Sequence, residues 1–151
     1  MIRPATPDDA LELAQLGTFF YKQAVLSGWG DIPYSVDDCA MALTQFMQLP
    51  NFLCFVCEKD GMIVGMIGGV ISPVYFNHNH VSGEELFWWV ADGAPPSAGL
   101  KLLTAIEDKA RELGCSTWQM KSLAHLNGER MEQLYTRRGY RASERLFIKE
   151  L

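Results

Sequence analysis

The sequence predicts an α/β (α+β) fold in which helices cover both faces of a mixed central sheet of about seven strands. Two kinds of segment alternate along the chain: short apolar runs, typical of buried strands, and longer segments with apolar residues every three or four positions. The sequence Lys59-Asp60-Gly61 predicts a tight hairpin turn, so the runs on either side of it should be antiparallel neighbours. Helices separate other pairs of runs. Hairpins with inserted helices predict a mixed sheet that is covered on both sides.

Length and composition favour a single domain that covers residues 1–151. Of the 151 residues, 48% are hydrophobic and 21% are charged, which is typical of a globular domain with one sizeable core. The net charge of −5 argues against a general nucleic-acid binder, which would carry a basic face. The N-terminus has no apolar signal core, and the apolar run at 62–71 is too short to span a bilayer. We therefore expect a cytoplasmic protein with no nucleic-acid or membrane partner.

Residues 1–50 contain one predicted strand and two predicted helices. Residues 1–5 are expected to form a short strand. Thr6-Pro7-Asp8-Asp9 is typical of a helix start, because threonine is a good N-cap, proline fits the first helical position and acidic residues suit the first turn. This helix should continue to about Leu26, and the glycine- and proline-rich residues 27–34 should form a loop. Ser35 then begins the second helix.

Residues 51–151 are expected to form most of the sheet. The expected elements, in order, are strands at 52–58 and 62–71, a loop at 73–82, a strand at 85–90, a helix at 97–113, a strand at 117–121, a helix capped by Asn127 and ended by Arg137-Arg138-Gly139, and closing strands at Tyr140 and at 145–151. Gly65, Gly68 and Gly69 interrupt the second of these strands, which predicts a bulge or a close neighbour.

Cysteine and histidine spacing does not predict a metal site. Cys54 and Cys57 have redox or zinc spacing, but strand residues three apart point to opposite faces, and no second pair accompanies them. We interpret the cysteines as small hydrophobic residues in a reducing compartment. His78 and His80 lie in the expected loop without a third ligand at a suitable spacing.

The segment from Glu84 to Gly99 carries most of the functional information. An apolar strand at 85–90 runs into a short loop, and that loop opens an amphipathic helix. A helix N-terminus that follows a strand binds anions readily, because its first N–H groups have no partner within the helix and the helix dipole favours negative charge.

Three segments, in order and at suitable spacing, resemble the GNAT superfamily of acyl-CoA-dependent N-acetyltransferases. They are IRPATPDDA at 2–10, similar to the family's first strand and helix start; ELFWWV at 85–90, similar to its central strand; and LYTRRGY at 134–140, similar to its late motif of tyrosine, basic residues, glycine and an aromatic residue. The resemblance covers essentially the whole chain and implies the GNAT fold, with acetyl-CoA as co-substrate and direct transfer of the acetyl group.

The resemblance also implies where coenzyme A binds. In the family signature Gln/Arg-x-x-Gly-x-Gly/Ala, Gly99 matches the final glycine and Ser97 replaces the first, while Pro95 and Pro96 stand where N–H donors are expected. The pyrophosphate is therefore expected to have fewer donors here than in typical members. The basic residues assigned to the cofactor have an alternative interpretation as solvated charges at helix ends. The residues assigned to the cofactor are Trp89, Val90, Gly93, Ser97, Ala98, Gly99, Leu100, Lys101, Arg137 and Arg138.

Tyr135, Glu84 and Glu85 are the catalytic candidates. Tyr135 matches the tyrosine that in many members donates a proton to the departing sulfur, although it also continues an apolar stripe from Met131 and would suit a core. The glutamates match the position of the family's general base, or else form a solvated strand end. Adjacent strand residues face opposite sides, so at most one of them faces the site, and the spacing from Val90 favours Glu84.

The acceptor side is indicated only by aromatic residues on loops. Trp29, Tyr34 and Tyr75 are the candidates for substrate binding, because exposed loop aromatics often form a binding wall. The predicted function is transfer of acetyl from acetyl-CoA to a primary amine of a small molecule or peptide. The alternatives are a non-catalytic GNAT-fold binding or regulatory protein and an acyltransferase with another thioester donor. The acceptor, and the choice between monomer and homodimer, stay open.

Overall fold

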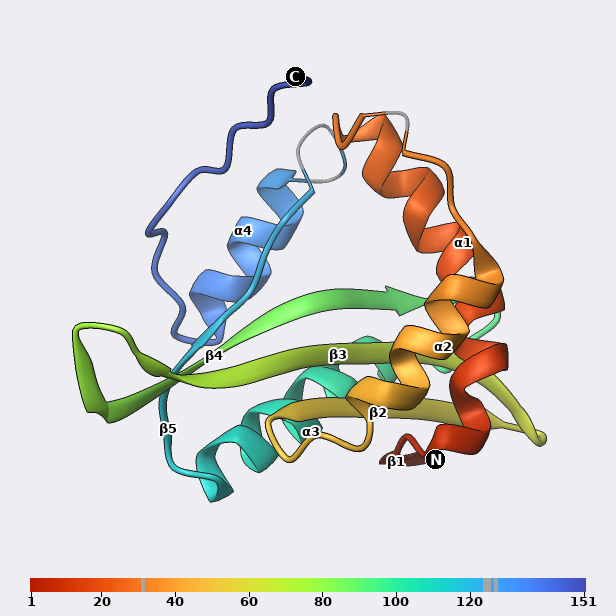
Figure 1. Ribbon diagram of the computed structural model, residues 1–151, viewed down its shortest axis with the longest axis horizontal. Helices are drawn as coiled ribbons and strands as arrows, with labels where there is room; N and C mark the ends of the chain where they lie inside the picture. The colour runs from red at the N-terminus through yellow and green to blue at the C-terminus, as the bar shows by residue number, and fades with distance from the viewer. Residues whose placement is uncertain (31, 124–125, 127) are drawn as a thin grey trace.

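A sheet in the order β1-β2-β3-β4-β5 forms the centre of the structure (Figure 1). The computed structural model describes residues 1–30, 32–123, 126 and 128–151. The first four strands are joined as antiparallel neighbours, and β5 pairs parallel to β4, so the sheet is mixed, as predicted. The elements are β1 Ile2–Pro4, the 3-10 helix η1 Pro7–Asp9, α1 Ala10–Leu26, α2 Val36–Phe46, β2 Phe52–Lys59, β3 Met62–Val74, β4 Asn77–Val90, α3 Ala98–Glu112, β5 Cys115–Gln119 and α4 Gly128–Arg137.

The helix starts predicted at Thr6 and Ser35 and the turn predicted at Asp60-Gly61 are confirmed. The Thr6 backbone N–H donates to the Asp9 carboxylate at 2.8 Å, which satisfies one of the free donors at the start of the first helix. The Ser35 hydroxyl accepts from the Asp38 N–H at 3.2 Å and caps α2. Between β2 and β3, Asp60 and Gly61 both adopt positive φ, 53° and 77°, as the tight hairpin turn requires.

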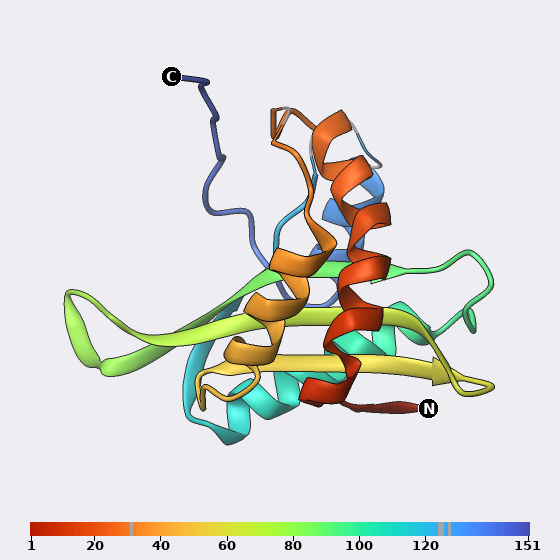
Figure 2. The same cartoon turned by 45° about the vertical axis from the view of Figure 1, so that its right-hand side comes forward.

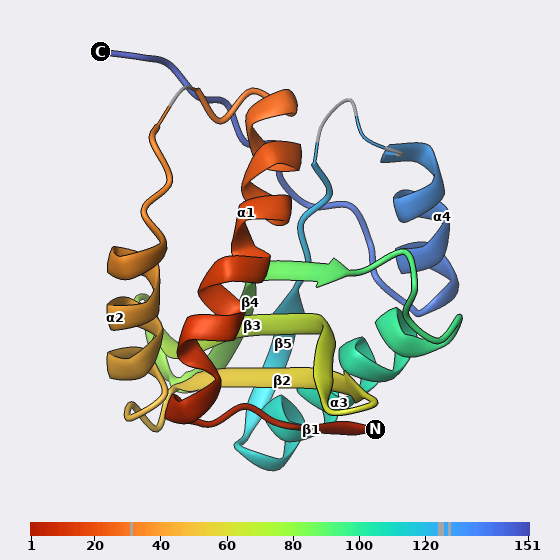
Figure 3. The same ribbon diagram turned by 90° about the vertical axis from the view of Figure 1, so that its right-hand side faces the viewer.

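Helices cover both faces of the sheet, with a separate apolar core on each (Figure 3). On one face α1 and α2 pack against β2 and β3 through residues such as Leu13, Leu43 and Val56. On the other face α3 packs through Leu102 and Ile106, which are fully buried. Cys54 belongs to the first core and Cys57 to the second, as strand alternation predicts. Among the described residues, no helix has the length and apolar character needed to cross a membrane.

A bulge in β4 lies opposite the Gly68-Gly69 pair of β3. Gly68 pairs with Phe87 whereas Gly69 pairs with Glu85, so Leu86 is an extra residue on β4. The glycines are needed, because a Cβ at position 68 would overlap the Phe87 ring and one at position 69 would overlap the backbone of β4. The sequence therefore predicted the bulge correctly from its glycines.

The sheet splits between β4 and β5. These strands pair only over Val81–Glu84 and Cys115–Gln119, and the last paired residues are Glu84 and Gln119. From Glu85 to Val90, β4 has a strand neighbour only on the β3 side among the residues that the structure describes. This confirms that the strands predicted at 85–90 and 117–121 are neighbours that separate, and it leaves an unpaired edge of β4 facing the gap.

The loop predicted at 73–82 is wrong. Strands β3 and β4 continue through this region as a long hairpin that projects from the body of the protein, with Tyr75 and Phe76 as its two-residue turn (Figure 2). The tip residues are largely exposed. Both sides of this arm face solvent, so it lacks the alternation of apolar and polar residues that reveals a half-buried strand.

The two closing strands are also wrong, and the sheet has five strands in the described part of the chain rather than about seven. Residues 141–151 form no strand and run past α4 to the C-terminus (Figure 1). Leu146 and Phe147 are 81% and 88% exposed. Their composition favours a strand, but strand propensity does not report whether an edge is available for pairing. The predicted cap Asn127, and His125, lie outside the described residues.

Candidate active site

Glu85 is a buried carboxyl group at the point where β4 leaves β5. Its side chain is 5% exposed, whereas the Glu84 side chain is about half exposed. Burial raises the pKa of Glu85 to about 7, against the effects of the Lys121 N–H, which donates to its carboxylate at 3.2 Å, and of the Lys121 charge. At neutral pH this carboxyl group is thus poised between its two protonation states.

The bulge at Leu86 determines which glutamate faces the α3 side. Trp88 and Val90 pack in the core beneath α3, whereas Leu86 and Phe87, on the two sides of the bulge, both pack on the α1 face. Strict alternation back from Val90 would put Glu84 on the α3 side, but the extra residue shifts the pattern by one. The structure therefore places Glu85 on the same face as Trp88.

Tyr135 lies beside Glu85, on α4. It is 8% exposed, and its O–H donates to the backbone carbonyl of Lys121 at 2.8 Å. Its ring lies 6.4 Å from that of Trp88 and 5.5 Å from that of Tyr140. Burial, and secondarily the nearby charge of Glu85, raise the pKa of Tyr135 above its ordinary value. The phenol therefore keeps its proton at neutral pH.

Lys121, just after β5, joins these two groups, and the sequence did not identify it. Its backbone N–H contacts Glu85 and its carbonyl contacts Tyr135. Its ammonium group donates to the Glu85 carbonyl oxygen at 2.8 Å and pairs with the Glu84 carboxylate at 3.2 Å. The only signal in the sequence was its place at the end of a strand predicted to run beside 85–90.

The start of α3 lies against the end of β4. A Cβ on Gly99 would be 3.4 Å from the Trp88 ring and 3.5 Å from Val90. The Ala98 N–H donates to the Pro95 carbonyl at 2.8 Å, but within the described chain the N–H groups of Ser97, Gly99 and Leu100 donate to no backbone carbonyl. The N–H groups of Ser97, Gly99 and Leu100 are therefore left without a backbone acceptor in the described chain, as is usual at a helix start.

The basic residues expected near the cofactor differ in their surroundings. Lys101 and Arg137 are exposed. Arg138 instead pairs with Glu107 of α3 at 2.5 Å, so its charge is already compensated and α4 is tied to α3. Lys59 is a further cation that the sequence did not single out: its ammonium group donates to the carbonyl of exposed Gly93 at 3.2 Å, in the loop before α3.

The two tryptophans of β4 face opposite sides. The Trp89 ring stacks on Phe19 of α1 with centroids 5.5 Å apart, so its backbone lies at the open edge while its side chain belongs to the α1 face. The Trp88 ring lies between α3 and Tyr135, and its indole N–H is buried without a hydrogen-bond partner in the described part of the chain. Trp88 therefore offers a free donor beside the split.

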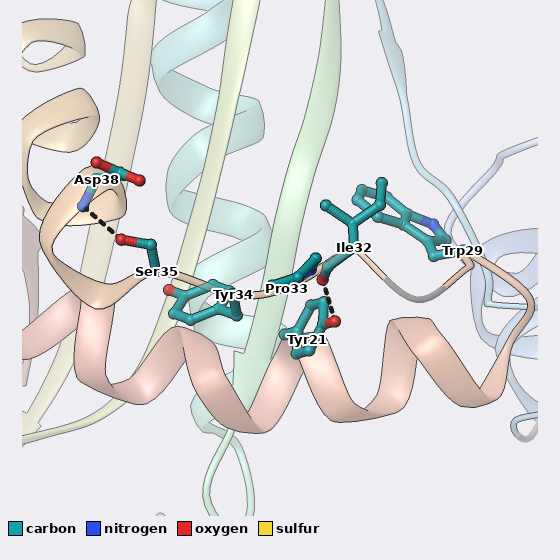
Figure 4. Close-up of a pocket in the computed structure, with 7 residues that line it drawn as sticks. All are labelled: Tyr21, Trp29, Ile32, Pro33, Tyr34, Ser35 and Asp38. Carbon is teal, nitrogen blue, oxygen red and sulfur yellow. Dashed lines mark hydrogen bonds between the residues drawn. The ribbon is translucent and has the colours of Figure 1, made fainter.

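Trp29 and Tyr34 line one pocket of about 260 Å³ between α1 and the loop that leads to α2 (Figure 4). The Tyr34 O–H donates to the Ala14 carbonyl at 2.7 Å, and the Tyr21 O–H donates to the Ile32 carbonyl. The tyrosine hydroxyls are thus used to fix the loop. The described residues that line it form a mainly apolar wall that includes the carboxylate of Asp38: Tyr21, Trp29, Ile32, Pro33, Tyr34, Ser35 and Asp38. Tyr75 lies far from this pocket, at the tip of the projecting hairpin (Figures 1 and 2).

No group of three metal-binding side chains occurs in the residues that the structure describes. The arrangement can instead support proton transfer: a buried carboxyl group with a pKa near 7 and a protonated phenol are held by one residue beside an unpaired strand edge.

Comparison with known proteins shows the family to which the chain belongs. The sequence matches the acetyltransferase (GNAT) family over residues 20–140. No curated protein sequence matches the chain. Among solved structures, similarity extends over 100% of this chain and 95% of an aminoglycoside acetyltransferase from an uncultured soil metagenomic sample, in complex with sisomicin, with a TM-score of 0.73 and 18% identity.

Two further structures share the fold at similarly low identity. A ribosomal-protein-alanine N-acetyltransferase from Brucella melitensis biovar Abortus 2308 has a TM-score of 0.72 at 17% identity, with 100% of this chain and 99% of that chain covered. An acetyltransferase of Trypanosoma brucei has a TM-score of 0.73 at 20% identity, with the same coverage. Since the family match spans most of the sequence and the fold agrees over its whole length, the chain belongs to the GNAT family of acetyltransferases.

Proposed function

We propose that this protein transfers the acetyl group of acetyl-CoA to a primary amine of a small molecule or peptide, with Glu85 as general base and Tyr135 as general acid. Acetyl-CoA is the co-substrate of the family. The observation that carries the proposal is the contact of both groups with Lys121: the Glu85 carboxylate and the Tyr135 hydroxyl are bound by the same residue, beside the open edge of β4.

The acceptor amine attacks the thioester carbonyl, so that a C–N bond forms and the C–S bond breaks. The proton lost by the amine passes to Glu85, directly or through water, because a carboxylate with a pKa near 7 can accept a proton at neutral pH. Tyr135 donates its proton to the departing thiolate, whose basicity is close to that of a phenol. Solvent then restores the proton of Tyr135 and removes that of Glu85.

The donor is expected to lie along the unpaired edge of β4. Alternate backbone groups of Glu85–Val90 face the split, where they can pair with the amides of the pantetheine arm, and the free indole N–H of Trp88 adds a donor. The pyrophosphate then reaches the start of α3, where Ser97, Gly99 and Leu100 supply N–H groups.

The acceptor is expected to be a cationic amine with an apolar body. The pocket of Trp29 and Tyr34 presents aromatic surface and the carboxylate of Asp38, a combination that suits an alkylammonium group. The structural relatives include an enzyme for amino sugars and one for a protein amine, so both small-molecule and peptide acceptors belong in the test.

The test measures release of free coenzyme A from acetyl-CoA with a thiol-reactive dye, across a panel of aliphatic, amino-sugar and peptide amines. We expect turnover with at least one amine, and a loss of roughly 10²-fold in kcat for Glu85→Gln. Glu112→Gln, on an exposed position of α3, is the matched control and should retain full activity. Acetyl-CoA binding without turnover of any amine would favour the alternative of a non-catalytic binding module.

A further inference from the structure

We infer that the Lys121 side chain is a positioning residue that clamps the end of β5 to β4, and thereby holds the Lys121 backbone against Glu85 and Tyr135. The inference rests on the proposed function, because it gives Lys121 a purpose only if Glu85 and Tyr135 act on the proton. Lys121 itself need touch neither substrate: it acts through the two groups that its backbone contacts.

The clamp lies where the sheet stops providing support. The last residues that pair β4 with β5 are Glu84 and Gln119, so no strand hydrogen bond fixes position 121. The Lys121 ammonium group replaces that support with two contacts to β4: the Glu85 carbonyl oxygen at 2.8 Å and the Glu84 carboxylate at 3.2 Å. One contact is to the backbone and the other to a side chain, so they hold the strand end from two directions.

The clamped backbone is what Glu85 and Tyr135 both use. The Lys121 N–H is the hydrogen-bond donor that the structure gives to the Glu85 carboxylate, at 3.2 Å, and the Lys121 carbonyl accepts from Tyr135 at 2.8 Å. These contacts are made by backbone atoms, so a substitution at position 121 keeps those atoms and removes the side chain that positions them, together with its charge. Such a variant leaves both reacting groups, Glu85 and Tyr135, in the protein.

The clamp also sets the charge around Glu85. Among the residues that the structure describes, the titratable groups that face Glu85 are Lys121 from the end of β5, Glu84 from its own strand and Tyr135 from α4. The ammonium charge of Lys121 lowers the pKa of Glu85, and the Glu84 charge raises it. Loss of the Lys121 charge must therefore move the Glu85 titration to higher pH, which a purely structural lysine elsewhere would not do.

The experiment compares Lys121→Met with Lys121→Arg and with Lys109→Met, whose lysine forms an exposed ion pair on α3. For Lys121→Met we expect kcat to fall by roughly ten- to a hundredfold, with KM for acetyl-CoA changed by less than about threefold, because orientation is lost rather than binding. The acidic limb of the pH profile of kcat should shift to higher pH by about half a unit or more. Lys121→Arg keeps the charge and should recover most of kcat, and Lys109→Met should match the native protein.

Glu84→Gln removes one of the two clamp contacts and provides a second variant should Lys121→Met fold poorly. It should lower kcat less than Lys121→Met does, because the bond from Lys121 to the Glu85 carbonyl remains. If Lys121→Met folds and shows native kcat and a native acidic limb, the inference is overturned; native kcat in Glu84→Gln together with equal loss in Lys121→Arg and Lys121→Met would overturn it as well.

A separate readout distinguishes failure of this inference from failure of the proposed function. The Glu85 carboxyl group can be titrated by ¹³C NMR in the native protein and in Lys121→Met, with no substrate present. A native protein that acetylates no amine would end the proposed function, but an upward move of the Glu85 titration in Lys121→Met would still support the clamp. An unmoved Glu85 titration would refute the clamp whether or not the protein is active.

Discussion

Glu85 is a residue whose place in the fold is unfavourable for stability. Its carboxyl group is 5% exposed and receives one backbone hydrogen bond, from Lys121, in the described structure. Burial of a charge with so few partners is costly, and such residues are found mainly where function needs them. The raised pKa of Glu85 and its cost to the fold are therefore two results of the same burial.

This cost predicts a pH-dependent gain in stability for Glu85→Gln. The pKa of Glu85 rises from 4.5 to about 7 on folding, so the carboxylate destabilises the folded state little below pH 4.5, increasingly up to pH 7, and fully above it. At pH 8 the free energy of unfolding of Glu85→Gln should exceed that of the native protein by about 3 kcal/mol. At pH 4.5 the difference should be less than about 1 kcal/mol. Urea unfolding at both pH values measures this, with Glu112→Gln as control. Equal gains at the two pH values would contradict a raised pKa.

A second prediction for a single residue concerns the effect of Tyr135→Phe on kcat. Tyr135→Phe removes the proton donor but keeps the ring that packs near Trp88 and Tyr140. We expect kcat to fall by roughly 10²-fold while KM for acetyl-CoA stays within about threefold. Steady-state kinetics with an amine that the native enzyme acetylates provides the measurement. A native kcat would assign Tyr135 to packing alone.

At the scale of elements, the loop before α3 limits how the protein holds its donor. Pro95 and Pro96 have no N–H, and the Ala98 N–H is bound to the Pro95 carbonyl, which leaves Ser97, Gly99 and Leu100 as free donors. Arg138 is paired with Glu107, so in the described structure the cations left at this helix start are Lys59, which contacts Gly93, and Lys101, in the first turn of α3. We therefore expect acetyl-CoA to bind in the weaker part of the micromolar range or above.

Repair of the loop should tighten that binding. The triple variant Pro95→Arg, Pro96→Gly and Ser97→Gly restores two N–H donors and adds a cation. Each neutral hydrogen bond contributes about 1 kcal/mol net, and a charge-assisted one about twice that, so affinity should increase roughly ten- to a hundredfold. Calorimetric titration with acetyl-CoA compares the two proteins. Nanomolar affinity in the native chain would refute the weakened loop, and unchanged affinity in the variant would show that these positions do not contact the pyrophosphate.

Elements with a local signal were predictable from the sequence, and those that depend on distant partners were not. The helix starts at Thr6 and Ser35 and the turn at Asp60-Gly61 carry their own capping and turn chemistry, so they were found. The hairpin arm is polar on both sides, and the strand-like residues at 145–151 lack a paired edge, so neither could be recognised from composition.

At the scale of the whole molecule, the site is assembled from three distant parts of the chain. β4 brings Glu85, the end of β5 brings Lys121, and α4, tied to α3 by Arg138 and Glu107, brings Tyr135. The sequence identified Glu85 and Tyr135 as candidates, because each matches a family motif. The spacing from Val90 favoured Glu84 over Glu85, because the sequence does not show how the bulge shifts alternation along β4. The sequence could not find Lys121, because that depends on strand register.

The pH dependence of kcat in the native protein and in Glu85→Gln tests the central claim most directly. The assay should use a weakly basic amine as acceptor, so that the pKa of the amine lies below the pH range of the measurement. Native kcat should rise with pH through about 7 and then level, and Glu85→Gln should lose that rise and be roughly 10²-fold slower at pH 8. The same rise and the same plateau in both proteins would contradict the assignment of Glu85 as the general base.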